Sequence, residues 1–187
     1  MIRGEGEAVV RGVTPRDVFD FVLDPAQYTR ADTKMRWVTK LADLPDGMIA
    51  REDGTFLGRF NGSVVSRYRW DPPHHIDVTL EHGVPVHLHA WFEIRGVDGG
   101  TWFRHVEEMD FGHGLVGRLY DAVARRWFAD AVTQEVAEIR RLLEAGERGR
   151  GVEGATPATA AARAAAGVGA QRAAASATAT AVTDGTS

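Results

Sequence analysis

His105 and Glu107 are the two side chains of this sequence best suited to proton transfer. They are two positions apart in an alternating segment, so a β-strand would direct both to the same face. An imidazole and a carboxylate on an apolar wall can remove and return a proton beside a carbonyl group, as aldol cyclisation and dehydration require. The alternative is structural: the pair hydrogen-bonds to each other or to a helix, or lies at the wet mouth of a cavity.

The turn Asp98-Gly99 fixes the register of the hairpin that carries this pair. A two-residue turn there places Phe92 opposite His105 and Ala90 opposite Glu107, which leaves room beside the carboxylate. The neighbours of the pair on the same face are apolar, so we expect this face to be buried. Its predicted members are Val86, Leu88, Ala90, Phe92, Ile94, Phe103, His105, Glu107, Met109 and Phe111.

Aromatic and aliphatic side chains of the same predicted face could form the wall of a ligand pocket. Tyr68 offers a hydroxyl group and Trp70 a flat apolar surface, although both could equally belong to an ordinary core. Trp37 and Tyr28 are ambiguous in the same way. The predicted ligand-binding residues are Val64, Tyr68, Trp70, Leu80, Leu88, Ala90, Phe92, Phe103, Met109, Tyr120 and Trp127.

Two other motifs are interpreted as structural. His87 and His89 have a spacing that can bind zinc, but they fall on the outer face without a clear third ligand. We therefore expect a solvated face with an ion pair between His89 and Glu108, and no metal site. The glycine pattern at 112–117 begins a helix in an antiparallel context, without the βαβ unit of a dinucleotide site. No cofactor is predicted.

Turn and capping signals divide the chain into elements. Residues 5–11 can form a strand, and Thr14-Pro15-Arg16-Asp17 begins a short helix, because threonine caps and proline suits the first turn. Asp24-Pro25 ends that helix and begins a second one over about 25–30. Residues 35–111 alternate in polarity between turns, which predicts about six antiparallel strands. Helical spacing then runs from Leu115 to about Glu144, and Gly146 ends the helix.

Composition restricts the possible functions. The chain has 187 residues, 22 Lys and Arg against 26 Asp and Glu, a net charge of -4 and no cysteine. Disulfides, cysteine nucleophiles and thiolate zinc sites are therefore excluded, and the charge argues against nucleic acid as a partner. No apolar run is long enough for a membrane span, and no signal peptide is recognisable at the start. We expect a soluble, cytoplasmic monomer or homodimer.

The last 42 residues differ from the rest. Residues 146–187 contain 15 alanines, and all 16 aromatic residues of the chain precede them. Such a segment cannot bury enough apolar surface to offset its chain entropy. We therefore predict one folded domain over residues 1–145 and a disordered, alanine-rich tail over 146–187.

The order of these elements resembles the helix-grip fold of the START-like, or SRPBCC, superfamily, in particular its polyketide cyclase/dehydrase and coenzyme Q-binding branch. The residues that carry the resemblance are Val13-Thr14-Pro15, Val18 to Val22, Asp24-Pro25, Trp70-Asp71-Pro72-Pro73 and Gly99-Gly100-Thr101. The resemblance implies an α+β fold: a curved antiparallel sheet of about seven strands around a long C-terminal helix, with two short helices after the first strand. It also implies an apolar cavity between sheet and helix.

Three functions are compatible with these features. The preferred one is binding of a hydrophobic small molecule, such as a lipid, quinone or polyketide, in the cavity. The alternative enzyme is a polyketide cyclase or dehydratase that uses Glu107 and His105 as its acid/base pair. The third is a protein-interaction module that acts through the tail or an exposed sheet edge. The superfamily has many functions, so the fold alone does not choose among them.

Overall fold

The computed structural model describes residues 1–112 and 114–146 of the chain, apart from the side chain of Val116. The elements follow the predicted order. They are β1 (Ile2–Arg11), α1 (Pro15–Leu23), α2 (Pro25–Ala31), β2 (Met35–Leu44), β3 (Gly47–Phe56), β4 (Phe60–Asp71), β5 (His75–Gly83), β6 (His87–Val97), β7 (Gly100–Asp110) and α3 (Leu115–Glu144). Residues 147–187, where the disordered tail is predicted, lie outside the described residues, so that prediction stays open.

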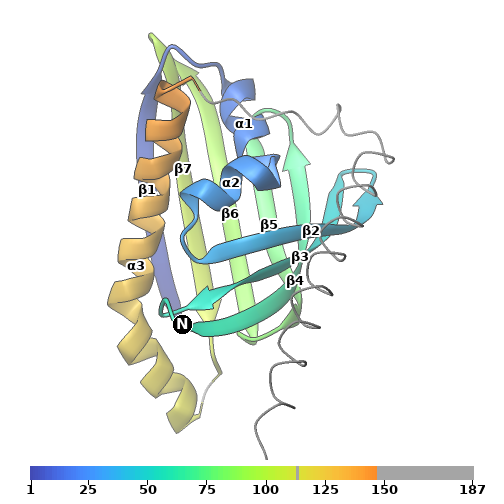
Figure 1. Cartoon of the computed structure of the whole chain (residues 1–187), viewed down its shortest axis with the longest axis vertical. Coiled ribbons are helices and arrows are strands. Elements are labelled where there is room, and N and C mark those ends of the chain that lie inside the picture. Colours follow the sequence, from blue (N-terminus) through green and yellow to red (C-terminus); the bar gives the residue numbers. More distant parts are fainter. Residues whose placement is uncertain (113, 147–187) are drawn as a thin grey trace, which may run out of the picture. The chain divides into compact units, whose positions relative to one another are not determined.

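The seven strands form one antiparallel sheet in the order β1-β7-β6-β5-β4-β3-β2. The sheet is curved and not closed, and α3 lies along its β1 and β7 side, while α1 and α2 lie over the inner face (Figure 1). This is the helix-grip α+β fold that the sequence predicts. Within the described residues, no helix is both long and apolar enough to cross a membrane.

Local signals explain the two short helices. The Thr14 hydroxyl accepts a hydrogen bond from the backbone N–H of Asp17, and the Asp17 carboxylate accepts one from the N–H of Thr14, which completes a capping box. The Asp24 carboxylate accepts a hydrogen bond from the N–H of Ala26 and so caps α2. The caps therefore fix where each helix begins.

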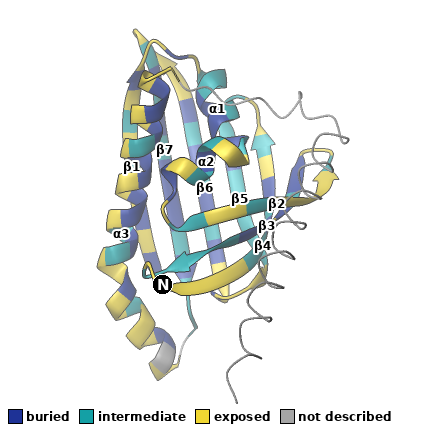
Figure 2. Cartoon of the chain, viewed as in Figure 1, coloured by how far each residue is buried: buried dark blue, intermediate teal, exposed yellow. Residues whose placement is uncertain are grey.

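Small residues allow α3 to lie close to β1. A Cβ atom added to Gly4 would be 2.5 Å from Cγ2 of Val132, and one added to Gly6 would be 2.9 Å from Cγ2 of Val136. The glycines therefore bring the strand and the helix into direct contact. From Ala124 onward α3 buries an apolar stripe that includes Phe128 and Ile139. Figure 2 shows that the first turns of the helix are more exposed than the rest of it.

The predicted register of the β6–β7 hairpin is confirmed. Ala90 pairs with Glu107 and Phe92 with His105, and the two rings of the second pair stack with their centroids 3.9 Å apart. One end of the predicted inner face is wrong: Val86 is 69% exposed. It precedes β6 and only its N–H reaches the sheet, donating to the carbonyl of Asp110, so no facing layer covers its side chain.

The outer face of the same hairpin needs a second correction. Glu108 lies opposite His89 in the strand register, as predicted, but the predicted ion pair is wrong: the Glu108 carboxylate accepts a hydrogen bond from Arg3 of β1 at 2.8 Å. Nε2 of His89 instead lies 2.7 Å from the carboxylate of Asp77 on β5. Each outer-face side chain has neighbours on two adjacent strands, and a hairpin register alone does not reveal the second neighbour.

Candidate functional site

A group of buried ionisable side chains lies in the interior of the domain, between the curved sheet and α3. Buried charged groups are rare unless they are paired, because the loss of water costs free energy. Here they are supplied by five elements and the segment before β2. We call this set the polar cluster: Tyr28, Asp32, Lys34, Glu52, Tyr68, His105, Glu107 and Glu135.

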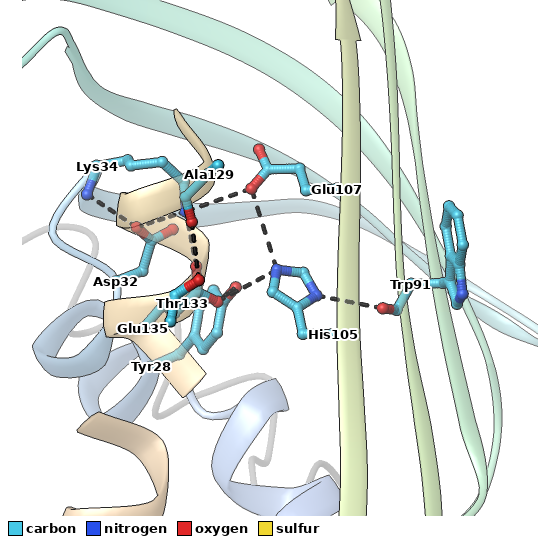
Figure 3. Close-up of polar contacts among 9 residues, drawn as sticks. All are labelled: Tyr28, Asp32, Lys34, Trp91, His105, Glu107, Ala129, Thr133 and Glu135. Atoms are coloured by element: carbon cyan, nitrogen blue, oxygen red, sulfur yellow. Dashed lines mark hydrogen bonds and ion pairs between the residues drawn. The ribbon is translucent and has the colours of Figure 1, made fainter. Parts of the chain in front are cut away.

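Lys34 is the cation of the polar cluster. Its Nζ atom lies 2.6 Å from Glu135 of α3, 3.1 Å from Asp32 and 3.2 Å from Glu107 of β7 (Figure 3). Burial by itself lowers the pKa of Lys34, but the three carboxylates outweigh it and raise that pKa well above its ordinary value. Lys34 is therefore a fixed positive charge rather than a base or a nucleophile.

His105 is held in a defined orientation. Its Nδ1 atom lies 3.1 Å from the backbone carbonyl oxygen of Trp91, which can only accept, so Nδ1 carries the proton. Nε2 points toward Glu135, 3.3 Å from Oε1, and toward Glu107 at 4.0 Å (Figure 3). Burial, followed by the charge of Lys34, lowers the pKa of His105 to about 3, so the ring is neutral and Nε2 is a bare acceptor.

Glu107 lies between these two groups. Burial raises its pKa to about 7, although the charge of Lys34 acts in the opposite direction. Such a carboxyl group exchanges its proton near neutral pH, which is the condition for acid–base chemistry. Burial also raises the pKa of Asp32. Both carboxyl groups therefore keep their protons to a higher pH than isolated carboxyl groups would.

Glu52 is the other carboxyl group of the cluster whose pKa is raised to about 7, and it lies on the sheet. The Tyr68 hydroxyl of β4 donates a hydrogen bond of 2.6 Å to Glu52 of β3. Burial raises the pKa of Glu52 to about 7, and the bond from Tyr68 acts against that rise. Tyr28 of α2 donates in the same way to Glu135, at 2.5 Å. The two tyrosines thus connect Glu52 of β3 to β4 and Glu135 of α3 to α2.

Three members of the cluster could in principle hold a metal ion. One ligand atom from each of His105, Glu107 and Glu135 lies within 4.8 Å of the others. However, the Lys34 ammonium group lies within 3.2 Å of both carboxylates and already supplies the positive charge that an ion would bring. The donor set is therefore better explained as an internal ion-pair network than as a metal centre.

The structure places the predicted site residues in different environments. His105 and Glu107 are buried, although they are 4.0 Å apart and each has a nearer charged neighbour outside β7. Of the predicted ligand-binding residues, Tyr120 is 44% exposed. The buried ones are Tyr68, Leu88, Ala90, Phe92, Phe103 and Met109, and the half-buried ones are Val64, Trp70, Leu80 and Trp127.

Lys34, Asp32, Glu52 and Glu135 escaped the sequence reasoning. Only Glu135 had a usable signal: it follows Val132 by three positions and precedes Ile139 by four, so it falls on the buried stripe of the helix. A carboxylate on such a stripe requires a partner. Nothing in the local sequence marks the others.

Four aromatic rings from β3, α3 and the residue after β7 contact one another beside the first half of α3. Phe56, at the end of β3, lies 5.0 Å from Phe111 and 5.2 Å from Trp127 between ring centroids, and Tyr120 stacks on Phe111 at 5.6 Å.

Two surface hollows, of about 400 and 380 Å³, lie away from these rings. None of the predicted ligand-binding residues lines either hollow.

These features define the class of protein by its fold: the chain has the START-like helix-grip fold, with a buried polar cluster inside. A START superfamily protein from Mycobacterium smegmatis is similar in structure, with a TM-score of 0.58 and 14% identity over 75% of this chain and 98% of that one. The aromatase/cyclase Zhui from Streptomyces sp. R1128 has a TM-score of 0.57 and 16% identity over 77% and 96%. The protein TTHA0849 from Thermus thermophilus has a TM-score of 0.67 and 11% identity over 77% and 98%.

The sequence itself gives no nearer assignment. No protein-family profile and no curated protein matches it. At these identities the structural likeness is a likeness of fold, and the function has to be argued from the side chains of this chain.

Proposed function

We propose that the interior of the grip binds a mainly apolar small molecule through a polar group of that molecule. One observation carries the proposal: the eight ionisable side chains of the polar cluster are buried or nearly buried in a fold whose solved structural neighbours include a START protein and aromatase/cyclases. Such a cluster costs stability, because each charge loses its water. A function that needs oriented donors and acceptors inside the domain explains why that cost is retained.

The side chains of the interior indicate where a ligand's polar group and its apolar part would each bind. Glu52, Tyr68 and the bare Nε2 atom of His105 can exchange hydrogen bonds with a hydroxyl or keto group. Phe92 and Phe103 present apolar surface on the same face. A lipid, quinone or polyketide with one oxygenated end fits this division. We place this activity in the cytoplasm, as the sequence predicts.

Retention of ligand tests the proposal. The full-length protein is purified under mild conditions, its mass is measured in the native state, and extracts are analysed for small molecules. A second arm adds a fatty acid, a short-chain quinone or an aromatic polyketide and measures the melting temperature. We expect a retained adduct or uptake of one of these probes, weakened about tenfold or more in Glu52→Gln. The outer-face variant Glu93→Gln is the matched control. A protein that neither retains nor takes up any of them contradicts the proposal.

A second candidate function is acid–base catalysis of an aldol cyclisation or dehydration. The observation that favours it is Glu107, a carboxyl with a pKa of about 7 that lies 3.2 Å from the Lys34 ammonium group. In this scheme Glu107 removes a proton beside a ketone while Lys34 stabilises the resulting enolate. Turnover of a poly-β-ketone by wild type, lost in Glu107→Gln while binding remains, supports catalysis. Equal turnover by both proteins refutes it.

A further inference from the structure

One end of the domain exposes large apolar side chains from several segments. Figure 2 shows that the first turns of α3, at the lower left, are largely exposed. Leu115, Leu119 and Val123 are spaced four residues apart along the helix and are 86%, 64% and 59% exposed. This spacing places them in one stripe on the solvent side of α3. Apolar side chains in this stripe do not contribute to the core, so their exposure on the surface requires another explanation.

Two loops bring further apolar side chains to the same end. Val84 and Val86 precede β6 and are 76% and 69% exposed, and the N–H of Val86 donates to Asp110, five residues before α3 begins. Phe60, which is 51% exposed, pairs with Phe56, whose ring contacts Phe111 and Trp127. We call these residues the end patch: Phe60, Val84, Val86, Leu115, Leu119 and Val123.

The charges around the end patch are mostly positive. Arg118 and Arg125 lie seven residues apart beside the stripe, and both are exposed. Cζ of Arg59 lies 4.9 Å from the ring centroid of Phe60. Two acids nearby are already engaged: the Asp121 carboxylate pairs with the N-terminal ammonium group, and Asp110 accepts from the N–H of Gly112. The end patch therefore combines apolar side chains with cationic neighbours.

The composition of the patch distinguishes between partners. No residue of the end patch lines either of the two surface hollows described above. Apolar side chains surrounded by arginines fit a flat, soft and negatively charged surface. We infer that the end patch docks the protein on membranes that contain anionic lipid. This inference goes beyond small-molecule binding and does not depend on it.

Vesicle binding by the full chain tests the inference. Vesicles of phosphatidylcholine alone, or with about 30% phosphatidylglycerol, are pelleted with the protein at low salt, about 50 mM, and at high salt, about 500 mM. We expect binding to the anionic vesicles at low salt and at least about tenfold less in Leu115→Ser/Leu119→Ser. Val86→Ser should weaken binding severalfold. The matched variant Val97→Ser, at the opposite end of β6, should bind as wild type does.

The charged rim is tested separately. Arg118→Gln/Arg125→Gln should lose most of the difference between the two vesicle types, whereas Arg11→Gln, at the far end of β1, should keep it. Circular dichroism and the sedimentation coefficient of each variant are measured first. Folded wild-type protein that does not bind anionic vesicles overturns the inference. A wild-type dimer that becomes monomeric in Leu115→Ser/Leu119→Ser overturns it as well, because the patch would then be an interface between copies.

Discussion

Nζ of Lys34 lies 2.6 Å from Oε2 of Glu135, although the two residues are 101 positions apart in the chain. This contact connects the segment before β2 to the middle of α3, and both side chains are almost completely buried. A buried pair is costly to form but more costly to break, because removal of one partner leaves an uncompensated charge. The behaviour of the polar cluster therefore depends on Lys34.

Lys34→Met should destabilise the domain by about 3–5 kcal/mol, because Asp32, Glu107 and Glu135 would lose their shared cation. Urea denaturation followed by circular dichroism measures the change in unfolding free energy. Lys40→Met is the matched control. Its partner Asp43 is 71% exposed, so we expect a loss below about 1 kcal/mol. If Lys34→Met is as stable as wild type, the ion-pair network does not exist as described.

The stability of wild type relative to Glu52→Gln should fall as the pH rises. The folded state raises the pKa of Glu52 from 4.5 to about 7, so it binds the proton more tightly than the unfolded chain does. The resulting stabilisation is complete below about pH 4.5 and is lost as the pH passes through 7. A shift of this size corresponds to about 3 kcal/mol. Urea titrations of both proteins from about pH 4.5 to about pH 8 measure it, and a difference independent of pH would be incompatible with a buried protonated Glu52.

His105 should remain a neutral ring, protonated on Nδ1, at all pH values well above 3. Its pKa is lowered to about 3 by burial and by Lys34, and the carbonyl of Trp91 selects the tautomer. Long-range proton–nitrogen NMR spectra of the ring distinguish the two tautomers and the imidazolium ion. An imidazolium signal for His105 at about pH 6 would contradict the assignment.

Gly4→Ala should destabilise the domain by about 1–3 kcal/mol, since the new methyl group would be placed 2.5 Å from Val132 and would push α3 away from β1. Gly62→Ala is a suitable control, because a Cβ atom there has no neighbour within 4 Å. The melting temperature of Gly4→Ala should therefore be clearly lower than that of Gly62→Ala. Equal melting temperatures would mean that the helix can move without cost.

Removal of residues 147–187 should change the melting temperature by less than about 2 °C, because a segment without large apolar residues contributes little to a core. Differential scanning calorimetry of the full and the shortened chains provides the comparison. A drop of more than about 5 °C would show that the tail packs on the domain and that its predicted boundary is wrong.

The architecture could be predicted from the sequence because its signals are local. Thr14 and Asp17 are three residues apart and cap α1, and the Asp98-Gly99 turn fixes the pairing of His105 and Glu107 with their partners on β6. Interactions over a few residues act in the same way wherever the segment lies. The same reasoning failed at Val86, since burial there depends on a facing layer that a hairpin pattern does not specify.

The sequence by itself determined the order of the elements, their caps and the face on which His105 and Glu107 lie. Only the tertiary structure decided what those two side chains meet: Lys34 and Glu135 reach them from the segment before β2 and from α3. Residues this far apart leave no periodic pattern, because their contact exists only after the sheet has curved around the helix. Burial then shifts their proton affinities, and burial is a property of the folded chain as a whole.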